Sequence, residues 1–300
     1  MILEIITQKV PLQNTSVELF IRREDLIHPF VSGNKFRKLK YNLLQAKKEN
    51  QATVVTFGGA YSNHIAAVAF AGKENGFKTI GIIRGEELAS KIIDNPTLQF
   101  AEKCGMTFDF ISRQDYQLKT ENNPKLITKY GKCYVIPEGG TNSLAIQGCE
   151  EIIQTTDTVF DFICCSVGTG GTLSGLINSS FSHQKIIGFP ALKGDFLQKD
   201  IRKFAKKENW ELNTDYHFGG YAKVTAELIA FMNAFYKENN IPLDPIYTGK
   251  MVFGVIDLIK QNYFSEKSKI LLIHTGGLQG IEGMNLKLKS KKLPTLNYND

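Results

Sequence analysis

The sequence predicts an α/β protein with two lobes, in which each lobe is an open, mostly parallel sheet with helices on both faces. Two observations support this fold class: short apolar strands alternate with helical segments, and glycine-rich turns follow three of the strands. Such strands are typical of parallel sheets whose two faces are both covered by helices. With 300 residues, 42% of them hydrophobic, the chain is long enough to bury a sizeable core in two lobes.

The N-terminal part predicts a strand over Val17–Arg23, followed by a loop and by the stretch Ser32–Lys40. A helix starts in that stretch, because leucine and alanine then recur at helical spacing until the polar run at 47–51. Alternating units follow, beginning with a strand at Val54–Phe57, a glycine turn and an alanine-rich helix over Ser62–Glu74. The same pattern predicts strands at Thr79–Arg84, Phe108–Ile111 and Cys133–Pro137, and a helix at Pro96–Lys103 that stops at Gly105.

A second series begins near residue 155 with the longest apolar strand, Val159–Val167, which runs into Gly168–Thr172. Further elements are strands at Lys185–Phe189 and Lys269–His274, and helices over Lys223–Glu238 and Met251–Gln261. No Gly/Ser linker separates the two series, so we expect the lobes to meet in a packed crossing. Residues 1–48 and 151–300 should form the larger domain and residues 49–150 the smaller one.

Composition and charge disfavour several classes of function. The net charge of +6 is modest and no basic repeat is interleaved with aromatic residues, so we expect no nucleic-acid partner. The N-terminus has no secretory pattern and no apolar run is long enough for a bilayer, so we expect a cytoplasmic protein without membrane contact. The five cysteines lack framework spacing and predict reduced thiols, with the neighbours Cys164 and Cys165 facing opposite ways. Lysines near the end predict a solvated tail (Lys287, Lys289, Lys291 and Lys292).

Lys35 is the candidate for covalent chemistry. It lies between a turn loosened by Gly33 and the start of a basic helix. Cations at Arg37, Lys38 and Lys40 would favour its neutral, nucleophilic amine. A basic helix start on a solvated face explains the same residues, and this window alone favours that alternative.

The turn Gly168–Thr172 lies between a strand and a helix, where free backbone amides point at an anion. A phosphate would fit there, although a turn that only closes a parallel strand fits the pattern about equally well. The turn lacks the Gly-Lys-Ser/Thr ending of a nucleotide-hydrolysing loop. No acidic residue closes the following strand as a dinucleotide ribose requires.

A second turn, Gly58–His64, places Ser62 at a helix N-cap, with Asn63 and His64 in the first turn. Its amides would hold a carboxylate, although capping alone explains Ser62. A third turn, Ile273–Gly277, follows the last predicted strand. Turns at the carboxyl ends of parallel strands converge on one crevice, where ligands bind in open α/β sheets.

Two other chemistries are disfavoured. The five histidines have no metal-ligand spacing, so we expect no metal. The chain has no Gly-x-Ser-x-Gly elbow, and no base can be identified for a serine nucleophile.

Together, these residues resemble the pyridoxal-phosphate enzymes of the tryptophan-synthase-β type, fold type II, and among them the 1-aminocyclopropane-1-carboxylate deaminase and D-cysteine desulfhydrase family. The resemblance covers nearly the whole chain and implies a homodimer whose larger domain binds the cofactor. It rests on ordered motifs, which are Arg23-Glu24-Asp25, Gly33-Asn34-Lys35 with Arg37-Lys38-Leu39, Gly58-Gly59 with Ser62-Asn63-His64, Ile136–Gly140, the Gly168 loop, Gly219-Gly220-Tyr221, Asp244–Lys250 and His274–Gly277.

The resemblance implies how the cofactor is held. Lys35 would bind it covalently, Asn63 would reach the ring hydroxyl, and Tyr247 would stack on the pyridine. The loop that would hold the phosphate consists of Val167, Gly168, Thr169, Gly170, Gly171 and Thr172.

The resemblance also implies a substrate side. Ser62, with the amides of Asn63 and His64, would receive the substrate carboxylate. Tyr221 would line the pocket there.

The choice within the family depends on two positions. Desulfhydrases resemble this chain in carrying threonine at Thr248 and Thr275, whereas the deaminases carry Glu and Leu. A carboxylate would keep the pyridine nitrogen protonated and the cofactor a strong electron sink, as ring opening without an α-proton requires; loss of a thiol from Cβ needs a weaker sink. We therefore expect a lyase that releases sulfide from D-cysteine, with Thr248 or Thr275 bonded to the pyridine nitrogen.

Three alternatives remain at this level. One is the ring-opening deaminase, and another is a non-catalytic cofactor-binding or amino-acid-binding protein on the same scaffold. The third is a glycine-rich α/β domain unrelated to the cofactor.

Overall fold

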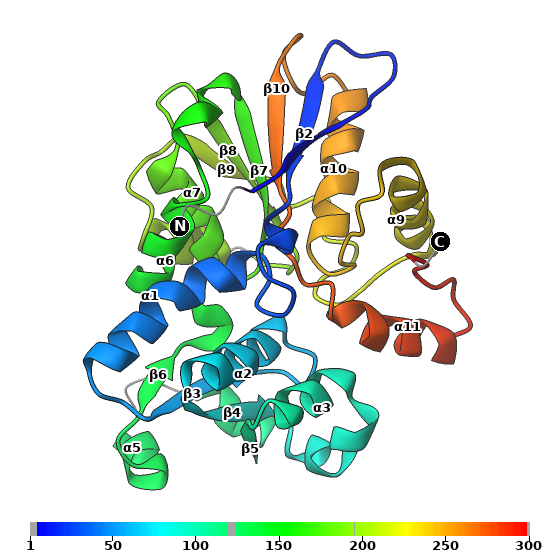
Figure 1. Ribbon diagram of the computed structural model, residues 1–300. Helices are drawn as coiled ribbons and strands as arrows, with labels where there is room; N and C mark the ends of the chain where they lie inside the picture. The colour runs from blue at the N-terminus through cyan, green and yellow to red at the C-terminus, as the bar shows by residue number, and fades with distance from the viewer. Residues whose placement is uncertain (1–4, 119–123, 195, 299–300) are drawn as a thin grey trace.

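The computed structural model describes residues 5–118, 124–194 and 196–298, and contains two mostly parallel sheets (Figure 1). One sheet has six strands in the order β1-β2-β10-β7-β8-β9, and the other has four in the order β5-β4-β3-β6. Within the described ranges, β1 and β2 form the only antiparallel pair. Helices lie on both sides of each sheet, which confirms the predicted fold class.

The predicted strands occur in the structure in the same order along the chain. The large sheet contains β1 (Thr7–Val10), β2 (Glu18–Arg22), β7 (Phe162–Val167), β8 (Lys185–Pro190), β9 (Trp210–Leu212) and β10 (Lys269–Ile273). The small sheet contains β3 (Thr53–Gly58), β4 (Lys78–Arg84), β5 (Thr107–Ile111) and β6 (Tyr134–Ile136). The helices are α1 (Asn34–Lys48), α2 (Asn63–Asn75), α3 (Pro96–Lys103), α4 (Arg113–Gln117), α5 (Pro124–Tyr130), α6 (Ser143–Glu150), α7 (Gly171–Ser179), α8 (Phe196–Arg202), α9 (Ala226–Asn239), α10 (Thr248–Lys260) and α11 (Gly280–Ser290).

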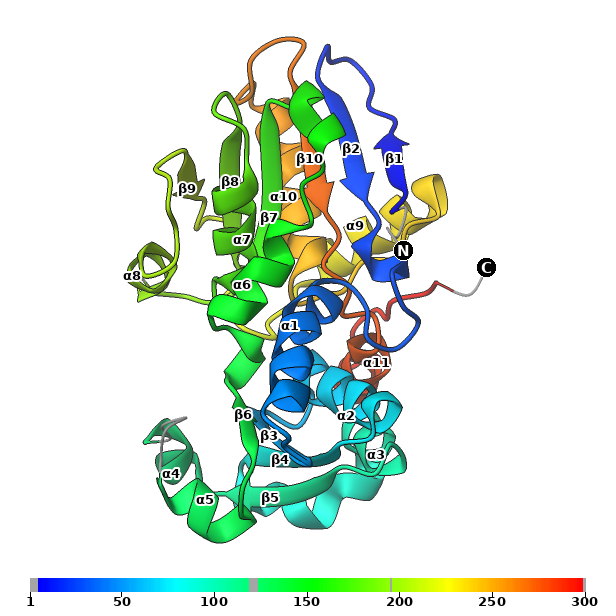
Figure 2. The ribbon, with the colours of Figure 1, turned by 60° about the vertical axis from the view of Figure 1, so that its left-hand side comes forward.

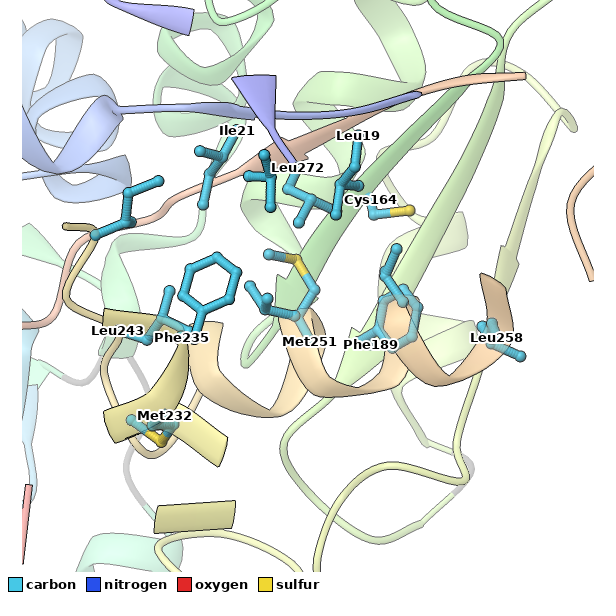
Figure 3. Close-up of a cluster of buried hydrophobic side chains, with 14 of the residues drawn as sticks. Leu19, Ile21, Cys164, Phe189, Met232, Phe235, Leu243, Met251, Leu258 and Leu272 are labelled. Atoms are coloured by element: carbon cyan, nitrogen blue, oxygen red, sulfur yellow. The ribbon is translucent and has the colours of Figure 1, made fainter. Parts of the chain in front are cut away.

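The large sheet has a separate apolar core on each face. On one face, Cys164 and Leu272 of the strands lie opposite Met251 of α10, together with residues of α9 (Figure 3). On the other face, Cys165 packs in a cluster with Leu173 of α7. Neighbouring cysteines therefore face opposite ways, as predicted, because side chains alternate along a strand.

The small sheet is covered in the same way (Figure 2). Val54 and Ile65 belong to a cluster that α1, α2 and α3 cover. Phe57 packs with Tyr116 of α4 on the opposite face. Both sheets therefore bury apolar side chains on two faces, which explains the nearly continuous apolar runs of the strands in the sequence.

Two predicted segments differ from the structure. The strand predicted at Val159–Val167 begins only at Phe162, because Thr155–Val159 forms a 3₁₀ helix. Buried Asp157 stabilises that helix by accepting from the amide of Gln154 at 2.7 Å and by pairing with Arg22 at 2.5 Å.

Of the four lysines predicted to form a solvated tail, Lys287 and Lys289 lie in α11, whereas Lys291 and Lys292 follow its end at Ser290; all four are exposed, as predicted. Met284 and Leu288, four residues apart, bury one face of this helix, while Lys287 and Lys289 are exposed. The short elements β9, α4, α5, α6 and α8 and the helix α11 were not predicted.

Helices α1 and α6 lie between the two sheets. They approach closely, since a Cβ added at Gly148 would lie 2.0 Å from the carbonyl oxygen of Arg37. They end at Lys48 and Glu150 respectively, next to the predicted domain boundaries, which remain our proposal. In the described residues, no helix combines the length and the apolar character needed to cross a membrane.

Candidate active site

A cavity opens at the carboxyl ends of β7 and β10, where the N-termini of α1, α2, α7 and α10 meet. Nine of the residues predicted for the site line it: Lys35, Asn63, Val167, Gly168, Thr169, Gly170, Thr172, Tyr247 and Thr275. The other five predicted residues, Gly171, Ser62, His64, Thr248 and Tyr221, lie around it and are outside its lining.

The turn after β7 provides free amide donors. Gly170 is the N-cap of α7, has a positive φ of 82°, and offers no side chain to cap the helix. Within the described residues, the amides of Thr169 to Thr172 have no hydrogen-bond acceptor in the protein. Free amides at a helix N-terminus form an anion site, so the arrangement favours the phosphate interpretation over a turn that only closes the strand.

Lys38 adds a cation to this turn, and sequence analysis did not include it among the site residues. Its side chain is 2% exposed and its Nζ donates to Gly139 O at 3.0 Å and to Thr141 Oγ1 at 3.1 Å. The same Nζ lies 3.4 Å from Thr169 Oγ1 and would lie 3.2 Å from a Cβ added at Gly171. The missed signal is helical spacing, since Lys38 lies three residues after Lys35 and on the same face.

Lys35 lies in the first turn of α1, at the bottom of the cavity. The preceding Gly33 has a φ of 61° and lies so close to the end of β10 that an added Cβ would be 2.0 Å from Thr275 O. Asn34 orients this turn by donating to Thr172 Oγ1 at 2.8 Å and by accepting from Lys35 Nζ at 3.2 Å. Gly33 therefore lets the start of α1 approach the end of β10 closely. This approach places Lys35 between the turn after β10 and the turn after β7.

Burial, and after it the charge of Lys38, lower the pKa of Lys35 from 10.5 to about 7. Arg37 does not contribute in the predicted way, because it points away and pairs with Glu24 at 2.9 Å. Lys40 is exposed and pairs with Glu151 at 2.7 Å. The prediction that all three neighbouring cations act on Lys35 was therefore wrong for two of them.

Tyr247 is the N-cap of α10, and its ring covers Gly168. A Cβ added at Gly168 would lie 3.1 Å from the Tyr247 Cε1 atom and hydroxyl oxygen, so a larger residue would have to push the ring away by a few tenths of an ångström. Burial raises the pKa of the Tyr247 hydroxyl well above its usual value. The ring of Tyr221 lies 6.3 Å from that of Tyr247, edge to face, and Tyr221 is 42% exposed.

The two threonines differ in their partners. Asp244 accepts from Thr248 Oγ1 at 2.8 Å and also from the amides of Tyr247 and Thr248 at 2.9 and 2.8 Å. Asp244 therefore caps α10 and engages the Thr248 hydroxyl. Thr275 lines the cavity, and its hydroxyl lies 3.2 Å from that of Ser166, a further lining residue that sequence analysis missed.

The turn before α2 is capped by its own serine. Ser62 Oγ accepts from the amides of His64 and Ile65 at 3.2 and 3.4 Å. His64 is buried, its Nε2 lies 2.8 Å from Thr56 Oγ1, and burial together with Lys35 lowers its pKa well below the usual value. Asn63 points toward the C-terminal glycine turn, since an added Cβ at Gly277 would lie 2.6 Å from its Nδ2.

These residues fit an elongated anionic ligand that reacts with an amine. The α7 turn and Lys38 suit a phosphate, Lys35 supplies a low-pKa amine, and Tyr247 supplies a flat face. No group of three or more metal-ligating side chains occurs in the residues that the structure describes.

Comparison with known proteins identifies the cofactor. Residues 3–276 match the family model described as "Pyridoxal-phosphate dependent enzyme". A "Putative 1-aminocyclopropane-1-carboxylate deaminase" of Thermotoga maritima is 33% identical over 294 residues, covering 90% of this chain and 92% of the relative. A "Bifunctional D-cysteine desulfhydrase/1-aminocyclopropane-1-carboxylate deaminase, mitochondrial" of Arabidopsis thaliana is 32% identical over 295 residues, covering 88% and 73%. A "D-cysteine desulfhydrase" of Klebsiella pneumoniae is 27% identical over 294 residues, covering 87% of each chain.

A solved structure agrees with these relatives. The crystal structure of an "ACC deaminase homologue" superposes with a TM-score of 0.84 and 29% identity, covering 96% of this chain and 94% of that one. The protein is therefore an enzyme that uses pyridoxal phosphate, and the chain belongs to the pyridoxal-phosphate-dependent enzymes, in the family of 1-aminocyclopropane-1-carboxylate deaminases and D-cysteine desulfhydrases.

Proposed function

We propose that this enzyme is a lyase that eliminates sulfide from D-cysteine, giving pyruvate, ammonia and hydrogen sulfide. The observation that supports this choice is the lack of an acidic side chain beside Thr275 among the described residues. Among the described residues, no aspartate or glutamate lines the cavity, and the hydroxyls of Thr275 and Ser166 lie together there. A hydroxyl partner for the pyridine nitrogen suits a substrate that has an α-proton and a leaving group on Cβ.

The residues around the cavity then take distinct roles. The α7 amides and Lys38 would hold the phosphate, Asn63 would bond the ring hydroxyl, and Tyr247 would pack on the ring. Thr275, rather than Thr248, bonds the pyridine nitrogen, because the Thr248 hydroxyl donates to Asp244. When bound, pyridoxal phosphate withdraws electrons from the Cα of the amino acid.

Lys35 acts as both the covalent anchor and the base. With the substrate bound, the free amine of Lys35 would accept the α-proton, and a pKa of about 7 matches that task at neutral pH. Ser62 and the amide of Asn63 would hold the substrate carboxylate, while the amide of His64, predicted for the same role, already donates to Ser62 Oγ. Tyr221 lines the substrate side.

The alternative is the ring-opening deaminase, which the names of the Thermotoga and Arabidopsis relatives favour. It would release 2-oxobutyrate and ammonia from 1-aminocyclopropane-1-carboxylate. A non-catalytic binding protein on the same fold would bind the cofactor at Lys35 without turnover.

The test measures pyruvate, 2-oxobutyrate and sulfide from D-cysteine, L-cysteine and 1-aminocyclopropane-1-carboxylate. We expect sulfide and pyruvate from D-cysteine; 2-oxobutyrate without sulfide would reverse the choice, and no product would favour the binding protein. Lys35→Ala should abolish turnover and the visible absorbance of the bound cofactor. Lys40→Ala, on the same helix but exposed, is the matched control and should retain both.

We also propose that the enzyme is a cytoplasmic homodimer. Leu44, 54% exposed, lines a groove between α1 and α2 whose lining combines apolar side chains with charged ones, among them Lys47 and Glu74, and such a mixed surface would suit a contact between copies. Light scattering of the purified chain measures its mass directly, and a monomer at micromolar concentration would contradict this part of the proposal.

A further inference from the structure

Arg84 differs from the other arginines of the chain. The sequence contains six arginines, and five of them pair with carboxylates: Arg22 with Asp157, Arg23 with Asp25, Arg37 with Glu24, Arg113 with Glu87 and Arg202 with Glu208. In the part of the chain that the structure describes, Arg84 has neither an ion pair nor a hydrogen bond. The nearby acid Glu87 does not serve it, because that carboxylate pairs with Arg113 at 2.6 Å.

The position of Arg84 places it at the substrate side of the small domain. It is the last residue of β4, one position beyond the pair Gly58↔Ile83 that ends the β3–β4 ladder. Its Nη2 lies over Gly59, 3.6 Å from where a Cβ would be, in the turn that leads to Ser62 and Asn63. Ligands of open parallel sheets bind at this end of the strands.

Tyr116 supports the guanidinium from below. The Cζ atom of Arg84 lies 5.7 Å from the centroid of the Tyr116 ring, which is 2% exposed. A buried ring under a half-buried guanidinium limits where it can point, and a cation–π contact of this kind leaves the N–H groups free for an anion. Burial raises the pKa of the Tyr221 hydroxyl, and the charge of Arg84 partly opposes that increase.

Two tyrosine hydroxyls and one carboxylate lie near Arg84. Burial raises the pKa of both the Tyr116 and Tyr221 hydroxyls, so both remain protonated at neutral pH. Glu138 also lies in this region and acts on both hydroxyls. Glu138 is hydrogen-bonded to the Tyr116 hydroxyl, so its carboxylate has a partner of its own in this region.

We propose that Arg84 binds an anionic group on the side chain of the substrate, so that the enzyme prefers amino acids whose Cβ substituent carries a carboxylate, phosphate or sulfonate. This inference rests on the proposed function, because it places such a substrate in the same site. The α-carboxylate then lies at the α2 turn, while the guanidinium holds the second negative charge in a bidentate contact. In such a substrate the Cα–H bond breaks, the proton goes to Lys35 Nζ, and the Cβ substituent leaves with its electron pair. Water then hydrolyses the remaining enamine to pyruvate and ammonia.

The binding test uses ligands without a leaving group. D-alanine, D-aspartate and D-2-amino-3-phosphonopropanoate are titrated into the holoenzyme by calorimetry. We expect the two anionic ligands to bind at least about tenfold more tightly than D-alanine, as hydrogen bonds to charged groups allow. Arg84→Gln should remove this preference and Arg84→Lys should keep part of it. Arg113→Gln, an exposed arginine of the same domain, is the control and should keep all of it.

The turnover test compares O-phospho-D-serine with D-cysteine by pyruvate release. Arg84→Gln should lower kcat/KM about tenfold or more for O-phospho-D-serine and leave that for D-cysteine nearly unchanged. An equal loss for both substrates, or no loss for either, would overturn the proposal.

The two proposals fail in different ways. Turnover of D-cysteine without any preference for anionic ligands would sink the role of Arg84 and leave the lyase standing. Anionic binding that depends on Arg84, without any elimination, would sink the lyase and leave the role of Arg84 standing. If neither anionic ligand binds, the role of Arg84 is overturned whatever the turnover.

Discussion

Helices α2 and α7 both begin at the site, but their first turns are satisfied differently. In α2, Ser62 Oγ accepts from the amides of His64 and Ile65. In α7, the N-cap is Gly170, and the amides of Thr169 to Thr172 lack an acceptor within the described residues. A glycine at the N-cap therefore leaves a helix N-terminus open to an anion, whereas a serine largely closes it.

The buried charges follow the same division. Lys38 Nζ lies at the α7 turn, where it contacts Thr169 and Thr141. The first turn of α2 contains His64 in place of a cation. Burial and the charges of Lys35 and Lys38 lower the pKa of His64, so its ring is neutral. These differences support our proposal that the phosphate binds at α7 and the less strongly charged carboxylate at α2.

The largest effect is expected from removing the cation at the α7 turn. Lys38→Met should weaken binding of pyridoxal phosphate about 10- to 100-fold, because a charged hydrogen bond to the phosphate is lost and its acceptors stay buried. Dialysis followed by cofactor titration measures this change. Lys40→Met is the control and should not alter the affinity, since Lys40 is exposed and pairs with Glu151. If Lys38→Met leaves the cofactor affinity unchanged, the charge of Lys38 does not explain why the phosphate would bind at α7 rather than at α2.

Much of this division was accessible from the sequence. The strand, glycine turn and helix units and the capping position of Ser62 depend on local spacing, and the structure has them at those places. The helical spacing of Lys35 and Lys38 also indicates that both side chains point to the same side of α1, but this signal was overlooked. In contrast, the start of β7 depends on the pairing of Asp157 with Arg22, residues 135 apart in the chain, and no local pattern reveals it. The choice between Thr248 and Thr275 likewise depends on what surrounds each hydroxyl.

A smaller effect concerns the pH dependence of Lys35. A lysine with a pKa of about 7 is mainly neutral above pH 7, so incorporation of pyridoxal phosphate into the apoenzyme should fall about tenfold per pH unit below it. Because the charge of Lys38 lowers the pKa of Lys35, Lys38→Met should shift the profile to higher pH. Stopped-flow absorbance measures the rate. A profile that stays in place would mean that burial alone sets the reactivity of Lys35.

The smallest effect is expected at the α2 turn. Ser62→Ala removes a cap from two amides and should lower the free energy of unfolding by about 1 kcal/mol, whereas Ser62→Gly should cost only a few tenths. Urea denaturation measures both. Cofactor affinity should not change in either variant, because the phosphate lies at α7, but the KM for the amino acid should rise, since the Ser62 hydroxyl donates to its carboxylate in our proposal. A loss of cofactor affinity as large as that of Lys38→Met would show that the two turns share the phosphate, and an unchanged KM would leave Ser62 as a helix cap alone.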